Sequence, residues 1–146
     1  MAEPVVWIIE RDHWVRATLR AELIERGFDA VGFESPHDAV AALAIPAEGH
    51  PVVVVVDLAS QQTEPSALAA FLRAGSRLVG CGSSVKLSGA EAGDITWSAM
   101  LRRPVSLGTI ADVVASQVDA AVRPPSPGPP RSPLTASGRA REPGRG

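Results

Sequence analysis

The sequence predicts an α/β domain built on a doubly wound, five-stranded parallel sheet, followed by a tail that has no core of its own. Two observations support this fold class. Short runs of β-branched residues alternate along the chain with segments of helical periodicity. One of these runs, Val52–Val56, consists of five consecutive valines, which indicates a strand covered on both faces at the centre of a parallel sheet.

The first half of the domain contains two predicted strands and two predicted helices. Val5–Ile9 is a short apolar run typical of a buried strand. A helix follows, between a capping residue at Asp12 and a stop at Gly27. Phe28–Phe33 returns to the alternation of a strand. The segment 35–43 predicts a second helix, because a serine, a proline and an acid stand at its start.

The second half repeats the alternation after the valine strand. A helix is predicted over Pro65–Ala74, and further strands over Arg77–Cys81 and Ile95–Leu101. The linker 83–94 is rich in Gly, Ser and Ala and predicts only a short or imperfect helix. Ser106 caps a last amphipathic helix, whose inner face carries Leu107, Ile110, Val113, Val114 and Val118.

The composition changes after Val122. Residues 123–146 contain seven Pro and four Gly and no aromatic residue, which predicts a disordered, Pro/Arg-rich tail. This tail carries five Arg and one Glu, a net charge of +4, whereas residues 1–122 carry 9 basic and 15 acidic side chains, a net charge of −6. We therefore expect a domain over 1–122 that does not bind nucleic acid directly, because phosphate contact needs a basic face.

The chain is expected to act in the cytoplasm. It has a single cysteine, Cys81, so that no intrachain disulfide can form, and the apolar residues around it predict a buried, inert thiol. Its start lacks the basic region of a signal peptide. No stretch approaches the roughly 18 apolar residues that span a bilayer, so we expect no membrane association.

Candidate functional residues stand at the predicted ends of four strands. In an open parallel sheet, ligands bind outside the carboxyl ends of the strands, where strand order reverses. An aspartate there can act as a carboxylate nucleophile towards phosphorus. Neighbouring acids can hold Mg²⁺, and a hydroxyl and a cation can bind phosphoryl oxygens. The residues expected to converge are Glu10-Arg11-Asp12, Asp57, Gly82-Ser83-Ser84 and Arg102-Arg103-Pro104.

Residues 4–122 resemble the receiver domain of bacterial two-component response regulators. The resemblance rests on Ile8-Ile9-Glu10-Arg11-Asp12, on Val55-Val56-Asp57-Leu58 and on Arg103-Pro104. It implies the flavodoxin-like topology of receivers. It also implies roles for single residues: phosphoacceptor (Asp57), acidic-pair position (Glu10 and Arg11), phosphoryl-contacting hydroxyl (Ser83), phosphoryl-contacting cation (Arg103) and cis-proline candidate (Pro104).

The departures from the family pattern concern the metal and the charges. The second member of the acidic pair falls on Arg11, and a guanidinium cannot ligate Mg²⁺. We expect its charge to take the cation's place beside Asp57, or to form a structural salt bridge to Asp57 or Glu10. Asp12 is a shifted substitute if the turn moves by one residue. Any Mg²⁺ would depend on Glu10 and Asp57, and Arg11 weakens that expectation.

Two hypotheses of function follow. The first is a stand-alone receiver in phosphorelay signalling, which accepts a phosphoryl group on Asp57 from a histidine kinase or phosphotransfer protein. It would then act on a downstream protein through the face around Trp97 and the last helix, 97–118. The second is a pseudo-receiver, a protein-interaction module that works without phosphorylation. Neither is an enzyme, since no Gly-rich phosphate loop follows the first strand. A homodimer remains open.

Overall fold

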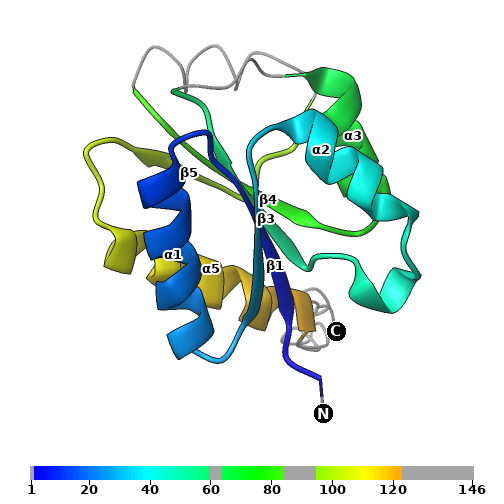
Figure 1. The fold of residues 1–146 in the computed structure, drawn as a ribbon, viewed down its shortest axis with the longest axis horizontal. Helices are drawn as coiled ribbons and strands as arrows, with labels where there is room; N and C mark the ends of the chain where they lie inside the picture. The colour runs from blue at the N-terminus through cyan, green and yellow to red at the C-terminus, as the bar shows by residue number, and fades with distance from the viewer. Residues whose placement is uncertain (1, 60–63, 84–94, 123–146) are drawn as a thin grey trace, which may run out of the picture.

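Five parallel strands form the centre of the fold in the computed structural model, which describes residues 2–59, 64–83 and 95–122 (Figure 1). The strands pair in the order β2-β1-β3-β4-β5, so the chain starts beside the middle of the sheet and winds outwards in both directions. All four pairings are parallel, which confirms the predicted doubly wound sheet. The strands are β1 (Val5–Ile9), β2 (Asp29–Phe33), β3 (Val53–Asp57), β4 (Arg77–Gly82) and β5 (Ala99–Arg102).

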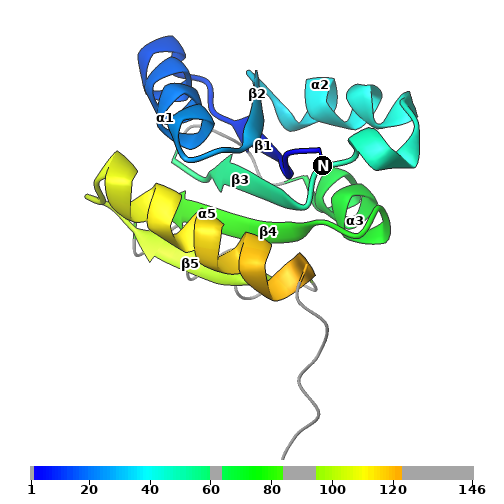
Figure 2. The same ribbon diagram turned by 90° about the horizontal axis from the view of Figure 1, so that it is seen from below.

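Helices cover both faces of this sheet (Figure 2). On one face lie α1 (His13–Glu25) and α5 (Leu107–Val122), and on the other lie α2 (Pro36–Ala41) and α3 (Pro65–Arg73). Two short 3₁₀ helices, η1 (Ala42–Ala44) and η2 (Ala47–Gly49), follow α2. The valine strand explains the layering, because successive side chains point to opposite faces. Val53 and Val55 pack under α1 and α5, while Val54 and Val56 pack under α2 and α3.

The predicted helix boundaries rest on local hydrogen bonds and turns. Asp12 caps α1 by accepting hydrogen bonds from the backbone N–H groups of Trp14 and Val15, at 2.9 and 3.1 Å. Gly27 and Gly75 follow α1 and α3 with φ at +93°, a conformation that favours glycine. The cap at Asp12 and the stop at Gly27 agree with the sequence prediction.

The start of the fifth strand was predicted wrongly. Pairing with β4 begins at Ala99, so Ile95–Ser98 precede β5 instead of belonging to it. Ile95 and Trp97 are half-buried and pack against the layer of α2 and α3. Their apolar pattern therefore reports contact with the core, which sequence periodicity does not distinguish from pairing at the edge of a sheet.

Two predicted segments lie outside the described residues. These are nearly all of the linker 83–94, of which only Ser83 is described, and the tail 123–146. Within the described ranges, no helix has the length and apolar character needed to cross a membrane.

Candidate functional site

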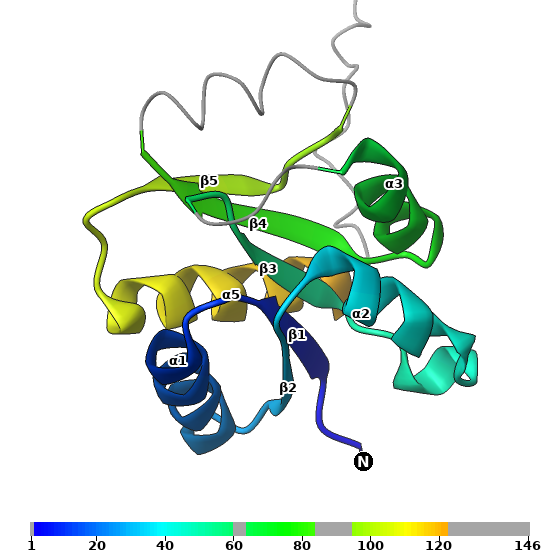
Figure 3. The ribbon, with the colours of Figure 1, turned by 45° about the horizontal axis from the view of Figure 1, so that its top comes forward.

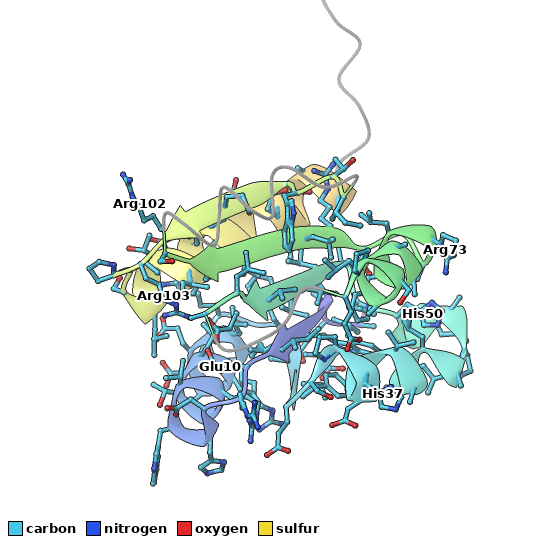
Figure 4. All side chains as sticks on the ribbon, turned by 90° about the horizontal axis from the view of Figure 1, so that it is seen from above. Glu10, His37, His50, Arg73, Arg102 and Arg103 are labelled. Atoms are coloured by element: carbon cyan, nitrogen blue, oxygen red, sulfur yellow. The ribbon has the colours of Figure 1, made fainter. Side chains whose placement is uncertain are left out.

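The carboxyl ends of β1, β3 and β5 bring three charged side chains together. Glu10 follows β1, Asp57 is the last residue of β3, and Arg103 follows β5. Figure 4 shows Glu10 and Arg103 near each other at this end of the sheet, while the neighbouring Arg102 points outward. The sequence predicted that all three would converge, and the structure places them in one cluster.

The guanidinium of Arg103 contacts both carboxylates of this cluster. Nη2 of Arg103 lies 3.2 Å from Oδ1 of Asp57 and 3.5 Å from Oε1 of Glu10. Asp57 is 5% exposed and Glu10 is 6% exposed, so both charges have lost most of their contact with water. Uncompensated charges in such a place are costly, and a shared counterion offsets part of that cost.

Backbone groups hold the two acids in position. Oε2 of Glu10 accepts a hydrogen bond from the N–H of Asp12 at 3.0 Å, and Oδ1 of Asp57 accepts one from the N–H of Ala59 at 3.1 Å. Arg103 is held by its own N–H, which donates to the carbonyl of Gly82 at 2.9 Å. The peptide bond between Arg103 and Pro104 is cis.

The pKa of Glu10 is raised above its ordinary value. Burial is the main cause and the charge of Asp57 adds to it, while the hydrogen bond from Asp12 and the charge of Arg103 act in the opposite direction. The charge of Arg103 thus offsets the effects of burial and of Asp57 on Glu10 only in part. A folded chain therefore binds a proton at Glu10 more readily than an unfolded one does.

Arg16 braces the turn that carries Glu10. Its Nη1 donates to the carbonyl of Glu10 at 2.7 Å and also lies 3.3 Å from the carbonyl of Arg11. Its side chain crosses β2 at Gly32, where a Cβ atom would lie only 2.7 Å from Cγ of Arg16. Sequence reasoning missed this brace, since it depends on a glycine in a neighbouring strand.

Arg11 does not occupy the place that the sequence predicted. Its side chain is exposed, and in the described part of the chain it forms no ion pair with Glu10 or Asp57. The physical reason lies in the turn after β1. Arg16 donates to the carbonyls of Glu10 and Arg11 while Asp12 caps α1, so the chain turns away from the sheet after Glu10. Among the described residues, the cation in contact with the two acids is Arg103.

Asp12, the predicted shifted acid, and Ser83, the predicted hydroxyl, lie at the edge of the cluster. Oδ1 of Asp12 is engaged as the cap of α1, and the backbone N–H of Asp12 points at Glu10. The turn has therefore not moved by one residue to offer Asp12 beside Asp57 as a ligand. Ser83 is exposed directly after β4, at the same end of the sheet.

A cavity of about 430 Å³ opens above this cluster. Its lining mixes three carboxylates with two guanidinium groups, and these two fixed cations do not fit a Mg²⁺ ion, which prefers carboxylates and water. In the described ranges, no group of three or more His, Cys, Asp or Glu side chains is placed to hold a metal ion. The lining residues are Glu10, Arg11, Asp12, Val15, Asp57, Ala59 and Arg103.

Cys81 lies in β4, next to Asp57 of β3, and is 1% exposed. Burial raises the pKa of its thiol to about 11, with Arg103 opposing the shift and the two acids adding to it. A neutral, buried thiol is a poor nucleophile.

We expect iodoacetamide at pH 8 to leave Cys81 of the native protein unlabelled, as measured by intact mass, and to label it fully in denaturant. Rapid labelling of the native chain would contradict the buried assignment.

The comparisons with known proteins identify the fold. No family model matches the chain, and no curated protein matches it. Among solved structures, it is similar to the signal receiver domain of a putative Luxo repressor protein from Vibrio parahaemolyticus. That match has a TM-score of 0.65 and 14% identity, and covers 82% of this chain and 92% of the other.

Two further receivers match over a similar length. The signal receiver domain of a signal transduction histidine kinase from Syntrophus aciditrophicus gives a TM-score of 0.67 at 14% identity, with 84% and 96% of the two chains covered. That of a modulated diguanylate cyclase from Desulfovibrio desulfuricans G20 gives 0.63 at 20% identity, with 82% and 96% covered. With its strand order and its strand-end cluster, this chain has the fold of the signal receiver domains.

Proposed function

We propose that this chain is a pseudo-receiver, a signalling module that binds its protein partners without phosphorylation of Asp57. The observation that supports this is the contact of one guanidinium with both buried carboxylates. In this proposal, the cation that pairs with the two acids in place of a metal ion is Arg103, whereas the sequence predicted Arg11 for that role.

The chemistry of phosphoryl transfer is the reason. A carboxylate nucleophile must approach phosphorus while positive charge, commonly from a metal ion, neutralises the phosphoryl oxygens. Oδ1 of Asp57 accepts from Ala59 and contacts Arg103. Arg11 stands where the family has its second acid and lines the cavity that a metal would enter. The cluster is therefore better suited to a fixed charge arrangement than to a phosphorylation cycle.

Such a cluster would act on partners through the adjoining segment. Arg103 joins β5 to the start of α5, so its ion pairs fix that connection relative to β1 and β3. We place the partner surface here, around Trp97 and α5. Trp97 itself is half-buried, and the outward side of α5 presents Asp112, Ser116 and Asp119, so the partner would meet a largely polar, acidic surface. No catalytic activity of the chain's own is proposed.

A phosphorelay receiver is the second candidate, and a specific observation favours it. Asp57 lines an open cavity of about 430 Å³, which is large enough for a small phosphodonor. In this case a histidine kinase or phosphotransfer protein would supply the phosphoryl group, and Arg103 would contact it.

One experiment separates the two candidates. The intact mass of the chain is measured after incubation with acetyl phosphate, with and without Mg²⁺, beside an Asp57→Asn control and an ordinary receiver treated in the same way. We expect no gain in mass under conditions that label the ordinary receiver. A Mg²⁺-dependent gain of one phosphoryl group, lost in Asp57→Asn, would overturn the pseudo-receiver proposal in favour of the second candidate.

A further inference from the structure

The outward side of α1 carries apolar side chains that the fold leaves uncovered. Four large hydrophobic side chains of the described residues are exposed: Trp14, Ile24, Val31 and Ile45. Two of them are on α1, with Trp14 76% exposed and Ile24 45% exposed. Figure 3 shows α1 at the outside of its layer, with its outer side turned away from the sheet. An exposed tryptophan of this degree is unusual, since the side chain is large and mainly apolar.

These two side chains belong to a regular stripe. Trp14, Ala17, Ala21 and Ile24, here called the α1 stripe, are all exposed and follow one another at intervals of three, four and three residues. This is the spacing of the a and d positions in a coiled coil. Leu19 and Leu23, which are buried against the sheet, lie on the opposite side of the helix. The α1 stripe therefore has the form of a seam for another helix, with small residues at its centre that permit close approach.

The charges beside the stripe favour one occupant and one orientation. Arg20 flanks it on one side and Glu25 on the other, at positions where coiled coils form ion pairs between helices. In a parallel pair of identical helices, Arg20 of each copy faces Glu25 of the other, which gives two symmetric ion pairs. An antiparallel pair centred on the stripe would bring the two Arg20 side chains together. Nε of Arg20 donates to the carbonyl of Ala30 at 2.8 Å, which holds the side chain on its flank.

We propose that a second copy of this chain docks on the α1 stripe, with the two α1 helices parallel across a two-fold axis. Trp14 and Ile24 of each copy then pack on their counterparts, and a two-fold interface of this kind is self-complementary. A stripe of three helical turns buries less than the roughly 1,200 Å² of a standard interface, so the dimer forms reversibly and depends on concentration. This inference goes beyond the proposed function, as it adds an interface on the outward side of α1, the helix that lies beside α5 in the same layer.

Sedimentation equilibrium of the full chain over a wide concentration range tests the proposal. We expect a monomer–dimer equilibrium whose dissociation constant rises about tenfold or more in Trp14→Ala, as for tryptophans that anchor interfaces. Ile45→Ala removes a side chain of similar exposure from another part of the surface, and is expected to leave the dissociation constant unchanged. A monomer at every concentration, or a dimer that Trp14→Ala does not weaken, would overturn the proposal.

A charge exchange tests the parallel orientation. Arg20→Glu and Glu25→Arg each place like charges opposite one another and are expected to weaken the dimer, while the double variant restores the opposite charges and recovers it. Circular dichroism of each variant shows whether the fold is retained. The recovery in the double variant cannot be produced by a loss of folding. Two single variants that weaken the dimer without recovery in the double would refute the parallel pairing.

Discussion

Replacing Arg103 with methionine is expected to lower the free energy of unfolding by about 3 kcal/mol at neutral pH. The variant keeps most of the length of the side chain but leaves Glu10 and Asp57 buried beside each other without their shared cation. Removing one partner of a buried ion pair costs about 3–5 kcal/mol, and the 30% exposure of the Arg103 side chain places this site at the low end. Urea denaturation measures the change.

The pH dependence of this loss identifies its origin. The pKa of Glu10 is already raised, so the stability of the wild-type protein falls as the pH rises from the ordinary carboxyl range through that raised pKa. Arg103 lowers the pKa of Glu10, and its removal raises that pKa further. The stability lost in Arg103→Met is therefore expected to be larger at pH 7.5 than at pH 5, because a larger fraction of Glu10 is protonated at the lower pH and the repulsion from Asp57 is then weaker.

A matched control separates charge pairing from the loss of any arginine. Arg73→Met changes an exposed arginine in the last turn of α3 and is expected to alter stability only slightly. A loss in Arg103→Met that is equal at both pH values would show that packing of the side chain, and not neutralisation of the two acids, is its contribution.

Replacing Phe71 with alanine is expected to lower the free energy of unfolding by about 4 kcal/mol. Phe71 is fully buried between α3 and the sheet, and its ring meets that of Trp7 edge-on, with ring centroids 6.5 Å apart. The substitution removes this contact and leaves a cavity that the valine strand, already packed on both faces, cannot fill by a small shift.

The neighbouring residue provides the control for Phe71. Leu72→Ala alters the same helix at a half-buried position and is expected to cost clearly less. Urea or thermal denaturation of the two variants gives the comparison. Since alanine has the highest helix propensity, a loss in either variant comes from packing, and equal losses would contradict a cost set by the depth of burial.

The sequence was sufficient for the sheet and for the convergence of the main site residues. Five adjacent valines predicted a central parallel strand, and the topology of such sheets then placed Glu10, Asp57 and Arg103 at one edge. These inferences succeed because they depend on the alternation of side chains within a strand and on the general rule for parallel crossovers. Both can be applied to a sequence without knowledge of contacts between distant residues.

The direction of individual side chains could not be predicted from the sequence in the same way. Arg11 was expected beside Asp57, but a brace from Arg16 and the cap at Asp12 turn the chain away after Glu10. That brace needs Gly32 in β2, a residue distant in sequence. The start of β5 was predicted wrongly for a related reason. The apolar residue Trp97 packs against the core without pairing with β4, and the sequence pattern is the same in either case.

The shared counterion also constrains the order in which the cluster can change by mutation. Loss of either acid leaves the other carboxylate in contact with the guanidinium of Arg103, so opposite charges still meet. Loss of the arginine first leaves two buried carboxylates facing each other. A lineage that abandons this charge arrangement is therefore expected to exchange position 10 or 57 before position 103. Descendants with an arginine and a single acid should outnumber those with two acids and no cation.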